Sequence, residues 1–395
     1  MKILKEINVG GKIAVDDTIL VKNVESTAGS HILEGFTPLF SAEAVERLEG
    51  KGYTIAAKTN VGEFGLDLVG ETSYYGAEKN GDRLVLTSSE LVKEDTVEAA
   101  LSVDVNGMPR RAAATSDICF IKPSYGTVSR YGVIACACSG EQIGVSAKTP
   151  SKCAEILSVI SGHDDKDGTS LRNENYNYTV NTDVKAKKVC IIKELIENVS
   201  ENVKAKILNT AKKLEALGLA VEEISFPEIS LSNTAWQILM SAETCNNLSK
   251  FDGVKYGYRT QNFKNIDDIY IGTRTEGFGF NTKAIILYGS DVLSKGRYEN
   301  CYDKAMRVRR IISEKLQEIF KSYDIILSPV MSKEYFSEYD LKDTFAVCFE
   351  ENLYTALANL TGIPAMVSSG VQLMANAFDE SVLLSVATKL LSEVK

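Results

Sequence analysis

The sequence predicts an α/β protein with a mixed, mostly parallel central sheet that is covered by helices on both faces. Short β-branched runs alternate with longer helical patterns, and residues 187–192, 202–217 and 220–224 are typical of a strand, a helix and a strand. Such an order favours a sheet covered on both faces. The 395 residues are 44% hydrophobic, which is enough to bury a large core. We expect one domain over residues 1–395, with a helix-rich excursion at about 230–323.

Each of these elements has a local reason. The helix at 202–217 carries apolar residues along one side, from Val203 to Leu214, and Gly218 follows it. The same spacing, from Ala305 to Ile319, predicts a helix at 303–320 inside the excursion. A last helix begins after Asp379-Glu380-Ser381, because acidic residues suit the start of a helix. Residues 368–373 are typical of a hairpin with a short tip.

Charge and hydropathy exclude several classes of protein. The net charge is −9 and the basic residues are interspersed with acidic ones, which argues against a surface that neutralises nucleic acid phosphates. No apolar stretch approaches the roughly eighteen residues of a membrane span, and the first residues lack the apolar run of a signal peptide. We therefore expect a cytoplasmic protein with no direct contact to nucleic acid or membrane.

Cysteine and histidine usage argues against a metal site. Cys136-Ala137-Cys138 has one spacer residue, and neither a second pair nor a histidine lies nearby in the sequence. Buried reduced thiols are the simpler interpretation of the eight cysteines. His31 and His163 are the only histidines, and we expect both in loops or at the surface. No metal is predicted.

Two segments, IAAKTNVGEFG at residues 55–65 and IKPSYGTVSRYG at residues 121–132, carry recognisable motifs. They resemble V-G-K-T-N-M-D-E-F-A and L-K-P-T-Y-G-R-V-S-R-Y-G of the amidase signature family. Residues 251–259, 276–279, 324–329 and 359–365 resemble later landmarks of the A subunits of glutamyl-tRNA(Gln)/aspartyl-tRNA(Asn) amidotransferases. The resemblance implies the amidase-signature fold, no cofactor, and a glutamine-hydrolysing role in tRNA-dependent amidation, a part of protein biosynthesis.

The resemblance also implies where the catalytic groups should lie. Family members use a lysine base, a relay serine and a nucleophilic serine in a glycine-rich loop. The lysine matches Lys58, but an ungapped count back from Lys122 puts the nucleophile at Met108 and the relay at Leu84. A small insertion or deletion would instead bring Ser88 or Ser89 to the relay position. Because a thioether cannot attack an amide, we expect Lys58 to be vestigial.

The loop that would bind the oxyanion is altered as well. The same count puts the family's Asp on Asp104, its second glycine on Gly107 and its Arg on Arg110. The first glycine becomes Asn106, which tolerates positive φ better than most residues. Pro109 follows the nucleophile position and removes a backbone N–H. The loop therefore keeps few of the features that this chemistry needs.

Of the two residues with which the family binds glutamine, one is matched in this sequence and one is replaced. Its arginine lies in a K-V-R motif that matches Arg309, although a helix-surface arginine beside Arg310 is an equal alternative. Its aspartate, which binds the substrate ammonium, falls on Asn352, and an amide supplies no charge for that group. Glu350 or Glu351 would compensate if the register slips.

Three hypotheses remain. The favoured one is a catalytically inactive paralogue of the amidotransferase A subunits that acts by binding or scaffolding, with B-like and C-like amidotransferase subunits as partners. The alternative is a functional amidase or glutaminase component with an unconventional nucleophile, for which Ser88, Ser89, Ser116 and Cys119 are the candidates. The third is a decaying gene product. The surroundings of Lys58 distinguish the enzyme from the other two.

Overall fold

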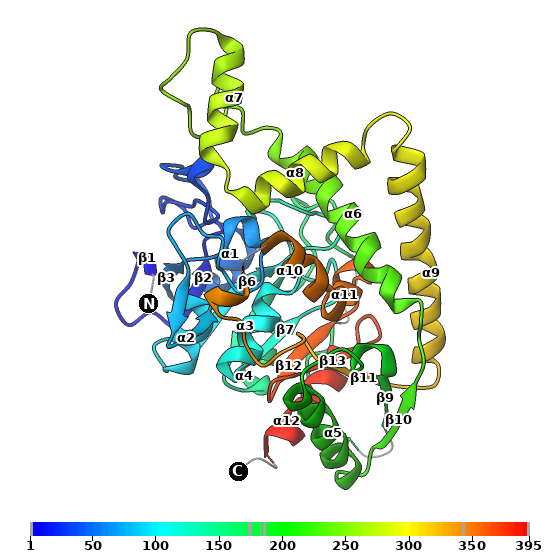
Figure 1. The fold of residues 1–395 in the computed structure, drawn as a ribbon. Coiled ribbons are helices and arrows are strands. Elements are labelled where there is room, and N and C mark those ends of the chain that lie inside the picture. Colours follow the sequence, from blue (N-terminus) through cyan, green and yellow to red (C-terminus); the bar gives the residue numbers. More distant parts are fainter. Residues whose placement is uncertain (1–2, 173–175, 182, 185–186, 342–343, 393–395) are drawn as a thin grey trace.

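The computed structural model describes residues 3–172, 176–181, 183–184, 187–341 and 344–392. Within these residues an eleven-stranded sheet has the order β1-β3-β2-β6-β8-β7-β12-β13-β11-β9-β10 (Figure 1). Its strands are β1 (Ile3–Glu6), β2 (Ile13–Asp16), β3 (Ile55–Thr59), β6 (Ala99–Asp104), β7 (Cys119–Lys122), β8 (Gln142–Ala147), β9 (Lys188–Ile192), β10 (Ala220–Ile224), β11 (Ile325–Ser328), β12 (Ala365–Ser368) and β13 (Val371–Ala375). A separate pair is formed by β4 (Glu78–Asn80) and β5 (Arg83–Val85).

In the described residues, helices lie between these strands along the sequence and after the last of them. They are α1 (Glu43–Gly50), α2 (Thr87–Lys93), α3 (Met108–Ser116), α4 (Pro150–Ile160), α5 (Glu201–Ala216), α6 (Ile229–Leu248), α7 (Ile266–Gly277), α8 (Phe280–Val292), α9 (Asp303–Phe320), α10 (Thr344–Glu351), α11 (Ala356–Thr361) and α12 (Glu380–Ser392), with a 3-10 turn η6 (Asn352–Tyr354). The predicted elements at 187–224 and 303–320 and the last helix are confirmed as β9, α5, β10, α9 and α12. In Figure 1, α7 projects from the body of the molecule.

The sheet is mixed, as predicted. Parallel pairs lie towards its two ends, where β2 pairs with β3 and β6, and β9 pairs with β10 and β11. From β6 through β11 the neighbouring strands are antiparallel. The parallel character that the strand-helix-strand order predicted therefore holds towards the ends and not in the centre.

Alternation along the central strands gives the sheet two different faces. On β6, Ala99, Leu101 and Val103 pack in the larger core, which also holds apolar residues of α1, α4 and α12. Ala100 points the other way, into a second apolar cluster with residues of α2 and α3. Because side chains alternate along a strand, Ser102 and Asp104 lie on this second face. The predicted site residue of β6, Asp104, therefore faces α2 and α3.

The hairpin predicted at 368–373 is confirmed as β12 and β13. Its two turn residues, Ser369 and Gly370, have φ values of 52° and 70°. Positive φ at both central positions is what a type I′ turn requires, and this turn matches the twist of the flanking strands.

Other expectations from composition can be placed in the structure. His31 stacks on Tyr74 with ring centroids 4.6 Å apart, and His163 lies in a loop beside Asp165. The eight cysteines are free thiols. Over the described ranges, no group of three or more His, Cys, Asp or Glu side chains could hold a metal ion, and no helix is long and apolar enough to cross a membrane.

Candidate functional site

Lys58 lies near the end of β3 and is fully buried. Its Nζ donates to the carbonyl oxygen of Asp16 at 3.1 Å and to that of Ile19, and it lies 3.5 Å from Oδ1 of Asp17. Burial lowers the pKa of Lys58, and the charge of Asp17 opposes that shift. Among the described residues, no serine, threonine or cysteine side chain bonds to this amine. The described partners of the Lys58 amine are therefore backbone carbonyl groups and a carboxylate, which hold it in place.

Leu84 and Met108 lie in the same buried apolar cluster. Both side chains are 1% exposed, and their cluster includes Val61, Leu68 and Phe336. The backbone N–H of Leu84 donates to the carbonyl of Phe336 at 2.8 Å, which fixes β5 against that segment. The two positions at which the resemblance implies hydroxyl groups are thus part of a packed hydrophobic layer.

A buried carboxyl next to Lys58 was missed by sequence reasoning. Asp16 is the last residue of β2, and its Oδ1 accepts a hydrogen bond from Thr59 Oγ1 at 2.9 Å. Burial raises the pKa of Asp16 to about 6, and the neighbouring hydroxyls of Ser102, Thr59 and Ser88 oppose that shift. The Oγ atoms of Ser88 and Ser102 are 3.5 Å apart. The only sequence signal was the acidic pair Asp16-Asp17 at the end of an apolar strand.

The other candidate nucleophiles are occupied, buried or unreactive. Ser116 donates to Glu90 Oε1 at 2.6 Å, so its hydroxyl is already committed to a carboxylate. Ser89 is fully buried. Burial raises the pKa of the Cys119 thiol to about 12, so at neutral pH the thiolate that would attack is scarce.

The altered loop forms a well-defined turn into α3. Gly107 has φ 98°, and a Cβ on it would lie 2.3 Å from Cγ2 of Thr355, so only glycine fits. Its N–H donates to Asp104 Oδ1 at 3.0 Å. Pro109 occupies the first turn of α3, where the N–H would have no partner within the helix. The proline therefore costs the loop no internal hydrogen bond.

Arg110 links this turn to residues 355–372 through hydrogen bonds. Its Nε donates to Asp104 Oδ2 at 2.7 Å, and its Nη1 donates to the carbonyl of Thr355 at 3.1 Å and to Gln372 Oε1 at 2.8 Å. Its Nη2 donates to Asp104 Oδ1 at 3.1 Å and to Asn359. Arg110 and Asp104 are both fully buried. The pair therefore links β6 and α3 to α11 and β13.

Lys122 should give the fold a distinct pH dependence. Its Nζ donates to the carbonyl of Pro123 at 3.0 Å, and burial lowers its pKa to about 7 against the attraction of Asp104. Between pH 7 and the ordinary lysine pKa the unfolded chain binds more protons than the folded chain, so this group makes stability rise with pH. Urea unfolding at several pH values should show that Lys122→Met removes a slope of up to about 1.4 kcal/mol per pH unit. An unchanged slope in the variant would contradict this assignment.

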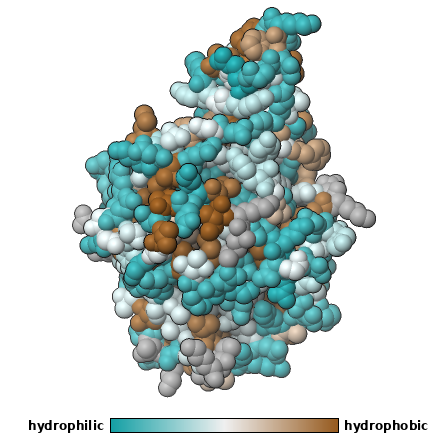
Figure 2. Space-filling model, turned by 90° about the vertical axis from the view of Figure 1, so that its left-hand side faces the viewer, coloured by the Kyte–Doolittle hydropathy of each residue, from teal (hydrophilic) through white to brown (hydrophobic). Residues whose placement is uncertain are grey.

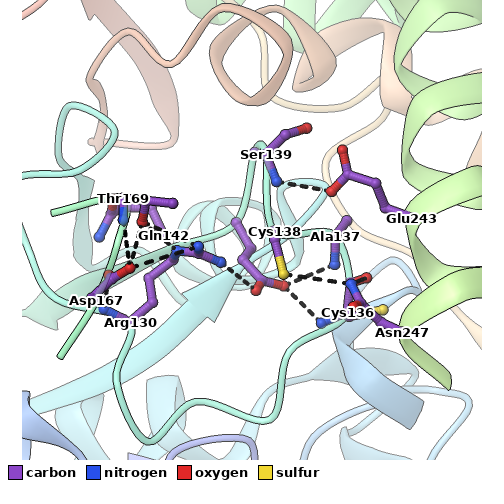
Figure 3. Close-up of polar contacts among 12 residues, drawn as sticks. Arg130, Cys136, Ala137, Cys138, Ser139, Gln142, Asp167, Thr169, Glu243 and Asn247 are labelled. Carbon is purple, nitrogen blue, oxygen red and sulfur yellow. Dashed lines mark hydrogen bonds and ion pairs between the residues drawn. The ribbon is translucent and has the colours of Figure 1, made fainter. Parts of the chain in front are cut away.

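The structure places Arg309 and Asn352 in separate networks. Arg309, on α9, donates through Nη2 to the carbonyl of Ser139 at 3.2 Å. Figure 3 shows the contacts that hold the loop containing Ser139, whose N–H donates to Glu243 Oε2 at 2.9 Å. Asn352, on η6, accepts a hydrogen bond from Arg111 Nη2 at 3.0 Å. No described contact joins Arg309 to Asn352.

The neighbours of Asn352 disfavour an ammonium group. Arg111 is fully buried, and its guanidinium contacts the amide of Asn352, the residue that the resemblance matches to an ammonium-binding aspartate. Glu351, which would replace that aspartate if the register slips, instead accepts hydrogen bonds from the N–H and Oγ of Ser332. A second cation would meet a positive charge here.

Comparisons with known proteins agree with this fold. The sequence profile of the Amidase family matches residues 9–384. The structure of the glutamyl-tRNA(Gln) amidotransferase A subunit from Thermotoga maritima superposes with a TM-score of 0.81 and 28% identity, covering 98% of this chain and 86% of that one.

Sequence relatives show the same likeness. The A subunit of the glutamyl-tRNA(Gln) amidotransferase from Streptococcus mutans is 37% identical over 401 residues, which covers 96% of this chain and 81% of the relative. The corresponding A subunit from Lachnoclostridium phytofermentans is 37% identical over 374 residues, covering 90% and 74%. A profile match over nearly the whole chain, together with relatives at this identity, shows that the chain belongs to the Amidase family.

Proposed function

We propose that this chain is a non-hydrolysing relative of the amidotransferase A subunits, which acts by binding within a cytoplasmic protein complex. The observation that carries the proposal is the packing of Met108 and Leu84 in one buried apolar cluster. Lys58 supports it, because this amine is bound to two carbonyl oxygens and lies beside Asp17. Amide hydrolysis needs a nucleophile with a route for its proton, and neither is supplied by these groups.

One observation favours the alternative, a working amidase with a different nucleophile. Ser88 Oγ lies 3.5 Å from Ser102 Oγ, and both hydroxyls neighbour Asp16, a carboxyl whose pKa burial raises to about 6. Such a carboxyl titrates close enough to neutral pH to accept a proton. Against it, Ser88 is fully buried and makes no described bond to Lys58.

The purified chain should release no ammonia from glutamine above a protein-free control, because a missing nucleophile commonly costs several orders of magnitude in turnover. A coupled ammonia assay measures this for the wild type, Lys58→Ala and Ser88→Ala in parallel. Ammonia release that scales with protein and disappears in Lys58→Ala would overturn the proposal. Release that disappears only in Ser88→Ala would establish the alternative.

The projecting helices support the proposal of a partner. Ile271 on α7, Phe280 at the start of α8 and Leu287 on α8 are 68%, 76% and 71% exposed. Residues of both helices line a groove of about 370 Å3. Figure 2 shows apolar side chains on the projecting part and on the body below it. A hollow of about 560 Å3 is lined mainly by apolar residues such as Leu33, Phe36 and Ile134, together with Glu34, Lys250 and Lys255. Exposed apolar side chains that gather on projecting helices favour an interaction site.

B-like and C-like amidotransferase subunits are the partners that we propose for this surface. Ile271→Asp combined with Leu287→Asp should abolish co-purification of such a partner from the native cell, because two buried charges would replace apolar contacts. Val9→Asp is the matched control, since Val9 is 92% exposed and lies outside α7 and α8. Sizing of each sample measures the complex. Equal recovery of partner with both variants would refute this surface, and monomer alone from the wild type would refute the partner.

A further inference from the structure

Arg111 presents unpaired donors inside the protein. It lies near the start of α3, is fully buried, and donates through Nη2 to Asn352 Oδ1 at 3.0 Å and to Thr355 Oγ1 at 2.9 Å. Over the described residues, its Nε and Nη1 atoms have no hydrogen-bond acceptor. Both acceptors that it does have are neutral. The charged guanidinium of Arg111 is therefore buried, and two of its three nitrogen atoms lack a hydrogen-bond acceptor.

A second buried group in the same network also lacks partners. The side-chain amide of Asn106 is fully buried, and neither its oxygen nor its nitrogen has a hydrogen-bond partner in the described part of the chain. Thr355 connects the two residues, because its Oγ1 accepts from Arg111 and donates to the carbonyl of Asn106 at 2.6 Å. Arg111 and Asn106, which both have buried polar atoms without partners, are thus connected through Thr355 by two hydrogen bonds.

The start of α3 adds a further positive influence. The helix runs for nine residues from Met108, and no side chain caps its N-terminus, where Gly107 is left-handed. Free N–H groups at a helix start favour negative charge, although here Pro109 has no N–H and that of Arg111 donates to the carbonyl of Gly107 at 2.9 Å. Arg111, the Asn106 amide nitrogen and the start of α3 therefore all present donors that require an acceptor, while the Asn106 amide oxygen requires a donor.

The carboxylates nearest to Arg111 are engaged elsewhere. Asp104 is bound by Arg110 through both of its oxygens. Glu351 is bound by Ser332, and it influences Arg111 through space without an ion pair. Over the described residues, no acidic oxygen lies within ion-pair distance of Arg111. An uncompensated buried charge is strongly disfavoured, so a counter-ion at this position would stabilise the fold.

From this geometry we infer that Arg111 and Asn106 bind a small anion, a halide or a formate-sized carboxylate, at the start of α3. The inference rests on the proposed function, since an anion at this position fits a site that binds and does not hydrolyse an amide. Binding forms no covalent bond. Arg111 Nε–H and Nη1–H donate to the anion, and the Asn106 amide N–H adds a third donor.

Crystals of the full chain soaked in sodium bromide test the site. An anomalous difference peak should lie within hydrogen-bond distance of Arg111 Nε or Nη1. The peak should vanish in Arg111→Gln, which removes the charge. It should also vanish in Asn352→Asp, which supplies a carboxylate within reach of the same guanidinium. It should persist in Arg310→Gln, a matched loss of charge at an exposed helix position.

Thermal unfolding in solution provides the second measurement. At constant ionic strength, with gluconate as the replaced anion, bromide or formate should raise the unfolding midpoint by about 1–2 °C per tenfold increase in concentration above the dissociation constant. The wild type and Arg310→Gln should show this shift, and Arg111→Gln should not. Bromide and formate arms distinguish a halide site from a carboxylate site.

Several outcomes would overturn the inference. One is a water molecule in place of bromide at Arg111. Another is a bromide peak without any stabilisation in solution, which means binding at crystal concentration only. A third is a bromide peak that persists in Arg111→Gln. A Glu351 carboxylate found paired with Arg111, with a bromide peak appearing only in Glu351→Gln, would also overturn it. None of these bears on ammonia release, so failure of this inference and failure of the proposed function remain distinguishable.

Discussion

Replacing Arg110 with methionine should lower the free energy of unfolding by about 3–5 kcal/mol, because the change leaves a buried charge without its partner. Burial disfavours the ionised Asp104 carboxyl, yet the charge and hydrogen bonds of Arg110 hold the pKa of Asp104 below its ordinary value. Without Arg110 that balance is lost, and acceptors on Thr355 and Gln372 lose their donor as well. Urea unfolding measures the change.

The control for Arg110 is Arg310→Met. The Arg310 side chain is 82% exposed and pairs with Glu314 at 2.8 Å one helical turn away. Exposed pairs of this kind contribute about 0.5 kcal/mol or less. In the double variant Arg110→Met/Asp104→Leu the loss should be smaller than in Arg110→Met, since no unpaired charge remains. A loss in Arg110→Met that is no larger than in Arg310→Met would contradict the proposed tie.

Met108→Ser should lower the free energy of unfolding by about 2–4 kcal/mol without creating activity. The loss follows from the cavity left in the apolar cluster and from a hydroxyl buried without a partner. Activity should stay absent because Lys58 remains bound to the carbonyls of Asp16 and Ile19. Urea unfolding and the ammonia assay check the two parts separately.

The control for Met108 keeps the volume of the side chain. Met108→Leu should cost less than about 1.5 kcal/mol, since volume-conserving apolar changes are tolerated in cores. Equal losses in Met108→Ser and Met108→Leu would mean that shape, and not polarity, determines the cost. Ammonia release by Met108→Ser that is lost on adding Lys58→Ala would show that the lysine can still act as a base.

The elements that sequence predicted well are those with a local cause. The periodicity of α5 and α9 and the short runs of β9 and β10 are visible within a few residues of themselves. The direction of the central strands was less predictable, because β7 pairs with β12, which lies far from it in sequence. Pairing between distant segments depends on tertiary packing rather than on local pattern.

The same limit applied to the site. An ungapped count from Lys122 put Asp104 and Arg110 in one motif, and in the structure these two form an ion pair at 2.7 Å. The contact between Arg111 and Asn352 was not predictable, since 241 residues separate them in sequence. Their meeting needs α3 and η6 to pack together, which no local pattern encodes. The functional roles of Lys58, Arg309 and Asn352 stay predictions.

The partners of Arg110 also bear on how the chain is synthesised. Asp104 lies in the first third of the sequence, whereas Thr355, Asn359 and Gln372 lie near its end. While the ribosome is still adding the middle of the chain, Asp104 is the one partner of the Arg110 side chain, among those described, that has already been synthesised. At that stage β7 also lacks its neighbour β12. Contacts this distant in sequence make folding slow and leave strand edges open. The nascent protein should therefore depend on chaperones until its last strands emerge, and a chain that stops before Gln372 should be degraded.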